Sequence, residues 1–147
     1  KLIDHLLLNF KKEPFFKKKL PKSTGRELFN INWLNKFNIK KYAPEDVQRT
    51  LLELSVVSIN DSIKKFCSKV DEIYICGGGS QNKFLIERLE SIVNIKINTT
   101  DKLNIPSQQV EAIAFAWLAE KCLKKENNNS PSITGAKGPR ILGVIHY

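Results

Sequence analysis

The residues best suited to chemistry lie in the segment ICGGGSQN, Ile75 to Asn82, which follows a short β-prone run and leads into a helical pattern. A strand that turns through glycines into a helix lets main-chain amides approach a ligand with no Cβ in the way. The positive N-terminus of the helix then faces that ligand. The segment predicts a turn that binds a nucleotide or phosphate. The alternative is a tight strand-to-helix turn that binds nothing.

The spacing of these glycines matches neither of two common phosphate-binding motifs. Both GxxxxGK[ST] and GxGxxG, started at Gly77, require a glycine where Asn82 stands. The turn alone is therefore a weak indication of a nucleotide.

Glu111 is the second candidate, because it lies in the first turns of a strongly apolar helical segment. Its helical neighbours Phe115 and Leu118 are both apolar. A carboxylate at this place either faces water at the edge of the helix or lines a cleft. In a cleft it could hydrogen-bond the hydroxyls of a polar substrate or orient a water molecule.

Two further segments are open to a structural and a functional interpretation. Ser23, Thr24 and Arg26 could contact an anion, but Thr24 and Glu27 have the spacing of a capping box, which favours a structural role. The glycine-rich segment TGAKGPR, with Arg140, is either a ligand-binding loop or a simple connection.

Hydrophobic periodicity predicts the elements that would position these residues. We expect helices at about 2–10, 25–36, 44–66, 81–92 and 107–122, with Ser107 as an N-cap, and strands at 70–76 and 95–98. The order strand, helix, strand, helix indicates a right-handed parallel crossover, with ligands at the carboxyl ends of the strands. Trp33 and Trp117 are expected in the core, and Lys124–Ser132 as a loop or a partly disordered segment.

Composition excludes several classes of protein. The 147 residues fit one domain or one lobe of a larger protein, and the longest apolar run, Ala112–Ala119, is too short to span a membrane. The net charge of +9 comes mainly from lysine, with four arginines among 24 basic residues, which disfavours a nucleic-acid partner. Three cysteines without a CxxC pair indicate reduced thiols in a cytoplasmic protein rather than a disulfide framework or a zinc site. The chain has no Met and starts at Lys1, so we expect that an upstream part is missing.

Four segments, in this order, resemble the C-terminal part of the anhydro-N-acetylmuramic acid kinases. They are PKSTGRELFN, ICGGGSQNKFLIERL, VEAIAFAWLAEK and SPSITGAKGPRILGVI. The resemblance runs from about Leu2 to the end of the chain, which is well under half of the family's usual length. It departs from the family where Lys19 and Leu20 precede a single Pro21, because a run of prolines is usual there.

The resemblance implies an α/β fold of the actin-like sugar-kinase superfamily, in which two ribonuclease-H-like lobes close over ATP and substrate. Residues 1–147 would be the C-terminal nucleotide-binding lobe, with a mixed sheet flanked by helices, and the N-terminal lobe would be absent from this chain. Gly77, Gly78, Gly79 and Asn82 match the strand–glycine–helix element that holds the nucleotide. Glu111 would face the sugar across the cleft.

The activity implied is that of a cytoplasmic carbohydrate kinase, a phosphotransferase with an alcohol group as acceptor. With ATP and Mg²⁺, it would open the ring of 1,6-anhydro-N-acetylmuramic acid with water and phosphorylate the 6-oxygen, in amino-sugar metabolism and peptidoglycan recycling. The family's general-base aspartate and first phosphate loop match nothing in this chain, so no catalytic residue and no metal ligand is assigned. We therefore expect the chain alone to be catalytically inert.

Two other functions remain open at this point. Another ATPase or sugar-kinase lobe of the same superfamily would share the glycine turn but not the PKSTGRE and TGA segments. A non-catalytic, lysine-rich remnant that binds nucleic acid would lose its affinity steeply as salt rises. No membrane partner is expected, and the oligomeric state, including a homodimer, is left open.

Overall fold

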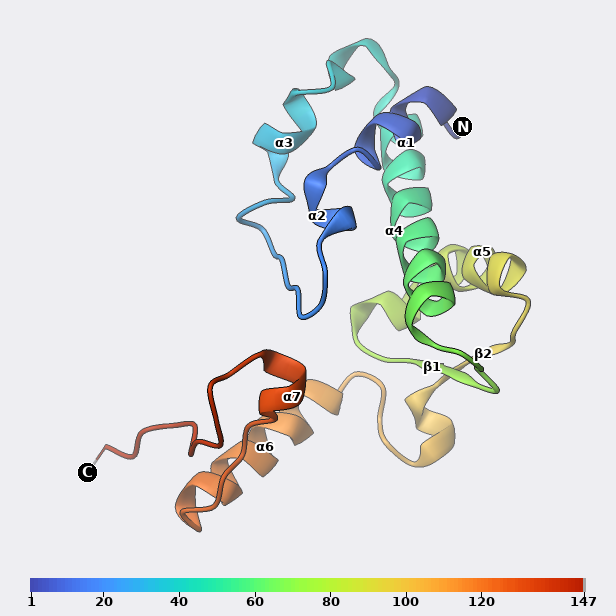
Figure 1. Ribbon diagram of the computed structural model, residues 1–147. Coiled ribbons are helices and arrows are strands. Elements are labelled where there is room, and N and C mark those ends of the chain that lie inside the picture. The colour runs from blue at the N-terminus through green and yellow to red at the C-terminus, as the bar shows by residue number, and fades with distance from the viewer. Residues whose placement is uncertain (147) are drawn as a thin grey trace. The chain divides into compact units, whose positions relative to one another are not determined.

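The computed structural model describes residues 1–146, which divide into two compact units. Unit 1 comprises Lys1–Ile73 and Lys83–Lys96, and unit 2 comprises Tyr74–Asn82 and the residues from Ile97 onward. The elements are those labelled in Figure 1. Those of unit 1 are α1 (Asp4–Phe10), α2 (Pro14–Lys17), α3 (Ile31–Asn35), η1 (Ile39–Lys41), α4 (Pro44–Phe66) and α5 (Lys83–Val93). Those of unit 2 are η2 (Gly78–Gln81), β2 (Ile97–Thr99), η3 (Thr100–Leu103), α6 (Val110–Leu123) and α7 (Pro131–Thr134). Strand β1 (Ile73–Ile75) has its first residue in unit 1 and the other two in unit 2.

The long helix α4 organises unit 1. Pro44 opens it, acidic residues occupy its first turn and Lys64 and Lys65 its last turn, as the helix dipole favours. Both α1 and α5 pack against it, so its apolar residues are covered by two neighbours (Figure 1). Thr50 fixes the start of α1, because its Oγ1 accepts a hydrogen bond from the Ile3 amide at 3.1 Å and donates to the Asp46 carbonyl at 2.7 Å.

Aromatic rings fill the core of unit 1 on the α1 side of α4. The Trp33 ring lies 5.0 Å from Phe10, 5.1 Å from Phe37 and 5.0 Å from Phe29, measured between centroids. The indole nitrogen of Trp33 donates to the carboxylate of Glu13 at 2.9 Å, so its polar atom is satisfied inside the core. The prediction that Trp33 is a core residue is confirmed.

A buried ion cluster joins α4 to α5. Glu53 is only 2% exposed, and Arg88 donates to its two carboxylate oxygens at 2.8 and 3.0 Å. Arg49, one turn earlier in α4, donates at 2.9 Å to the same carboxylate. This fork-like pairing supplies the counter-charge that a buried carboxylate needs.

The helix expected over residues 25–36 is much shorter in the structure. Only α3 forms, because the side chain of Asn30 accepts from the amides of Asn32 and Trp33 and starts the helix there. Glu27 caps the amide of Gly25 at 2.6 Å instead of completing a box with Thr24. The expected boundary was wrong because Asn competes strongly for the N-cap position.

Unit 2 contains a two-stranded parallel sheet, in which β1 lies beside β2. The chain reaches β2 from β1 through η2 and α5, which agrees with the expected strand–helix–strand order. The expectation for Ser107 was wrong, because α6 begins at Val110 with Gln109 as its N-cap. Trp117, expected in the core, is 48% exposed. Within residues 1–146, no helix has the length and hydrophobicity that crossing a membrane requires.

The polar run after α6 is a loop up to α7, as one of the two alternatives for Lys124–Ser132 predicted, and hydrogen bonds anchor it. Asn128 is 5% exposed. Its amide nitrogen donates to the carbonyls of Leu118 at 3.0 Å and of Leu142 at 3.1 Å. Its side-chain oxygen accepts from the Leu142 amide. One asparagine therefore joins α6 to the extended segment that follows Gly138.

We expect Asn128→Ala to release that extended segment locally. The substitution removes three hydrogen bonds around a buried position, which is worth about 2 kcal/mol. The Leu142 amide should then exchange its hydrogen roughly 30-fold faster. Asn127→Ala, at the exposed neighbouring position, is the matched control. Equal exchange rates in the two variants would show that Asn128 does not hold the segment.

Candidate functional site

The candidate site begins at the turn between β1 and η2. Gly77 has φ of +73°, a left-handed conformation that a side chain would strain. Its carbonyl accepts from the Ser80 amide at 3.0 Å and from the Ser80 hydroxyl at 2.7 Å. Gly79 accepts from the Asn82 amide at 3.1 Å. The turn is therefore closed by its own backbone, and glycine at position 77 has a structural reason.

Gly78 has no such structural reason. Its φ lies outside the left-handed range, and a Cβ built on it would meet no protein atom within 4 Å. Glycine at this position therefore leaves the space beside its Cα, at the start of η2, free of protein atoms. The first amides of a helical turn have no carbonyl partner within that turn and can donate to a ligand.

The loop before α6 holds the glycine turn in place. The Gly77 amide donates to the carbonyl of Ser107 at 2.7 Å. The side-chain amide of Gln108 donates to the carbonyl of Gly77 at 2.9 Å and to the hydroxyl of Ser80 at 2.8 Å. Sequence patterns did not indicate Gln108 or Ser80, because their roles depend on the approach of two segments that are distant in the chain.

The predicted site residues are thus brought to one region of unit 2. Glu111 is exposed in the first turn of α6, a helix whose preceding residues, Ser107 and Gln108, bind the glycine turn. Asn82 is also exposed and ends the turn. The exposed carboxylate and the glycine turn therefore share one framework.

Asp101 stiffens that framework. Hydrogen bonds from Thr99 and then Ser107 hold the pKa of Asp101 below its ordinary value, and the carboxylate accepts from the Ser107 amide at 3.2 Å. Because the folded pKa is lowered, this ordering is complete above the ordinary pKa of Asp and is lost as pH falls through the folded value. The loop that carries Ser107 stays ordered at neutral pH.

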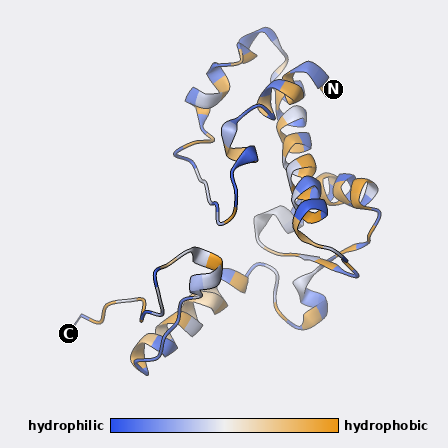
Figure 2. Ribbon diagram, in the orientation of Figure 1, coloured by the Kyte–Doolittle hydropathy of each residue, from blue (hydrophilic) through white to orange (hydrophobic). Residues whose placement is uncertain are grey.

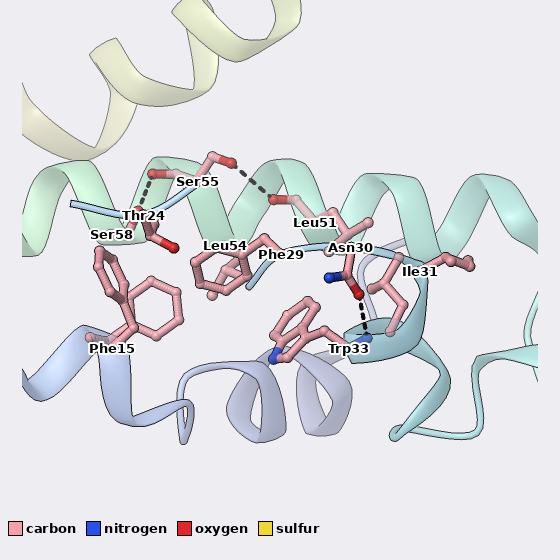
Figure 3. Close-up of a pocket in the computed structure, with 12 residues that line it drawn as sticks. Phe15, Thr24, Phe29, Asn30, Ile31, Trp33, Leu51, Leu54, Ser55 and Ser58 are labelled. Atoms are coloured by element: carbon pink, nitrogen blue, oxygen red, sulfur yellow. Dashed lines mark hydrogen bonds between the residues drawn. The ribbon is translucent and has the colours of Figure 1, made fainter. Parts of the chain in front are cut away.

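The segment with Ser23, Thr24 and Arg26 lies in different surroundings, in unit 1. Thr24 lines a cavity of about 610 Å³ whose walls include Phe15, Phe29 and Leu54 (Figure 3). Such an apolar lining does not favour an anion. The predicted capping box of Thr24 and Glu27 does not form, and Thr24 instead belongs to the wall of this cavity.

The fit of a metal to the described residues is poor. Residues 1–146 contain no group of three or more His, Cys, Asp or Glu side chains placed to hold an ion. The three cysteines are free thiols, as expected. Mg²⁺ bound together with a nucleotide takes most of its ligands from phosphate oxygens and water, so it does not require such a group here.

Comparison with known proteins places this framework in one family. The sequence model described as "Anhydro-N-acetylmuramic acid kinase" matches residues 1–147. Proteins of that name share 45% sequence identity with this chain in Pseudomonas syringae pv. tomato, 46% in Nitrosospira multiformis and 42% in Coxiella burnetii. The alignments cover 99%, 90% and 100% of this chain, and 41%, 37% and 39% of the respective relatives.

The chain therefore spans about two fifths of the length of these curated relatives. The match nevertheless extends over its whole length, through both the glycine turn and α6. The chain belongs to the anhydro-N-acetylmuramic acid kinase family.

Proposed function

We propose that the chain forms part of an ATP-dependent kinase that phosphorylates 1,6-anhydro-N-acetylmuramic acid. In this proposal, residues 1–147 are the C-terminal, nucleotide-binding lobe of a two-lobed, ribonuclease-H-like enzyme. The family membership supports the kinase, and the names of the relatives support the sugar. The cytoplasm and the recycling of peptidoglycan are the setting that this activity implies.

The observation that carries the proposal is the open space at Gly78. The amides of η2 would donate to phosphate oxygens of ATP there, and Gly77 provides the turn that makes the approach possible. Gly79 and Asn82 complete the same element. ATP would supply the phosphoryl group, and Mg²⁺ bound with it would neutralise charge on its phosphates.

Glu111 would hydrogen-bond the sugar from the start of α6. In the proposed reaction, the oxygen of water forms a bond to the anomeric carbon while the bond from that carbon to the 6-oxygen breaks. The 6-oxygen takes the γ-phosphoryl group of ATP, and ADP leaves. The proton of the water passes to a general base, which the family resemblance places outside this chain. Glu111 orients the sugar and does not take that proton.

A chimera tests the proposal. In it, this chain replaces the matching two fifths of the Pseudomonas syringae pv. tomato relative. We expect the chimera to phosphorylate 1,6-anhydro-N-acetylmuramic acid with ATP, and the isolated chain to show no such activity, because positioning and charge neutralisation are needed on both sides of the phosphates. A folded chimera without activity, or an active isolated chain, would contradict the proposal.

Glu111→Ala in the chimera should raise KM for the sugar about tenfold and leave KM for ATP unchanged. Loss of one hydrogen bond donated by a substrate hydroxyl to a charged carboxylate accounts for this magnitude. Glu120→Ala is the matched control, since Glu120 is exposed on the same helix and forms an ion pair with the surface residue Lys124. Equal sugar KM values for the two variants would remove Glu111 from the site.

A further inference from the structure

Helix α6 is strongly apolar, yet the described structure buries none of its residues. Its sequence is VEAIAFAWLAEKCL, and none of its 14 residues is buried. Phe115 is 64% exposed. Figure 2 shows the hydrophobic character of most of this helix. A helix that is hydrophobic all round is ordinarily an interior helix, so its surface here lacks its usual cover.

One side of α6 is already shaped as a groove. Phe115, Leu118 and Cys122 on the helix face Leu142, Val144 and Ile145 of the extended C-terminal segment across a cavity of about 590 Å³. We call this cavity the α6 groove. All of its lining residues are apolar or, at Cys122 and Gly143, a thiol and a glycine.

The groove is held open by contacts within unit 2. Asn128 binds the segment through the carbonyl of Leu142, as described above. Gly143 has φ of +110°, and a Cβ built there would lie 3.1 Å from the Sγ of Cys122. The segment therefore runs against the helix at Gly143, where a side chain would be strained and crowded, and the groove exists before any occupant binds.

The chemistry of the groove and the size of the relatives indicate its occupant. A chain with a net charge of +9 presents no charged residue in this groove, so an apolar partner fits and a nucleic acid does not. About three fifths of each curated relative lies outside the region that this chain matches. That remainder is a polypeptide large enough to cover the groove and the rest of α6.

We infer that the α6 groove is the docking surface for an apolar segment of the polypeptide that corresponds to that remainder of the relatives. The inference deepens the proposed function, since it rests on the two-lobed enzyme, and it assigns to α6 the contact that joins this chain to the rest of the fold.

The rate of alkylation of Cys122 tests the inference, because its thiol lines the groove. Iodoacetamide modification is followed by mass spectrometry in the isolated chain and in the chimera. We expect Cys122 to react at least about tenfold more slowly in the chimera. Cys67, which is exposed in unit 1, is the internal reference and should react at the same rate in both proteins. Equal rates for Cys122 would overturn the inference.

Paired variants of the chimera separate docking from general damage. Phe115→Glu places a charge in the groove and should restore fast alkylation of Cys122. Leu8→Glu, at a position in α1 that is 62% exposed, is the matched control and should leave Cys122 protected. A Phe115→Glu chimera that folds and still protects Cys122 would contradict the inference.

A second copy of the chain is the competing occupant. In that case the isolated chain would dimerise in sedimentation experiments, and Cys122 would be protected at high concentration without any other polypeptide, which would overturn the inference. Because the alkylation readout needs neither ATP nor sugar, a protected Cys122 in an inactive chimera would reject the proposed function alone. Unprotected Cys122 in an active chimera would reject the groove alone.

Discussion

Gly78→Val in the chimera is expected to weaken ATP binding by about 100-fold. The new side chain would occupy the space beside Gly78 that holds no protein atom and that the proposal assigns to phosphate. Phosphate oxygens would then lose two charge-assisted hydrogen bonds from main-chain amides, each worth about 1.5 kcal/mol or more. Isothermal titration calorimetry with a non-hydrolysable ATP analogue measures the change directly.

The same substitution should leave the fold intact, because the Cβ at position 78 meets no protein atom. The matched control is Gly138→Val, at a glycine whose added Cβ would meet only the Arg140 side chain at 3.5 Å. We expect this control to bind the analogue as the unchanged chimera does. Equal losses in both variants, or none in either, would count against a nucleotide at the glycine turn.

Glu53→Gln should lower the free energy of unfolding of the chain by about 3 kcal/mol. The substitution leaves the guanidinium groups of Arg49 and Arg88 facing a neutral amide at a position that is almost fully buried. Removing one partner of a buried ion pair costs more than the pair itself contributes. Urea denaturation followed by circular dichroism measures the loss. Asp61→Asn is the control, because Asp61 of α4 forms an exposed ion pair with Lys11. It should change the free energy of unfolding by less than about 1 kcal/mol.

The pH dependence of stability provides a second measurement of the same cluster. Burial raises the pKa of Glu53, but the hydrogen bonds and charges of Arg88 and Arg49 outweigh burial and lower it overall. The stabilisation is therefore complete above the ordinary Glu pKa of about 4.3 and is lost as pH falls through the lower folded value. Glu53→Gln should flatten the acid side of the stability curve. An unchanged acid limb would show that the cluster does not titrate as described.

Local sequence signals predicted the helices of unit 1 where those signals were unopposed. Pro44 and the acidic first turn fix the start of α4, and its two apolar stripes required the neighbours α1 and α5. The signals failed where two caps competed, at Thr24 and Asn30, since the choice depends on how Trp33 packs. The ion cluster of Glu53 could not be predicted, because Arg88 lies 35 residues away in the sequence.

The candidate site shows the same division between local and tertiary information. The glycines in the sequence indicated the turn at Gly77, because a left-handed backbone conformation favours glycine. The contacts from Ser107 and Gln108 that bring Glu111 into the same framework depend on tertiary approach and carry no such signature. The exposure of Trp117 could not be predicted either. An apolar helix indicates that its side chains are buried, but not which part of a protein covers them.

Amide hydrogen exchange in the chimera tests the central claim, that main-chain NH groups of the triple-glycine turn donate to a bound nucleotide. Exchange is compared with and without a saturating ATP analogue, with peptides that cover residues 77–82 and, as a reference, the core of unit 1 around Trp33. The account predicts slower exchange at 77–82 when the analogue is bound. Unchanged exchange at 77–82 in a chimera that is saturated with the analogue would contradict the account.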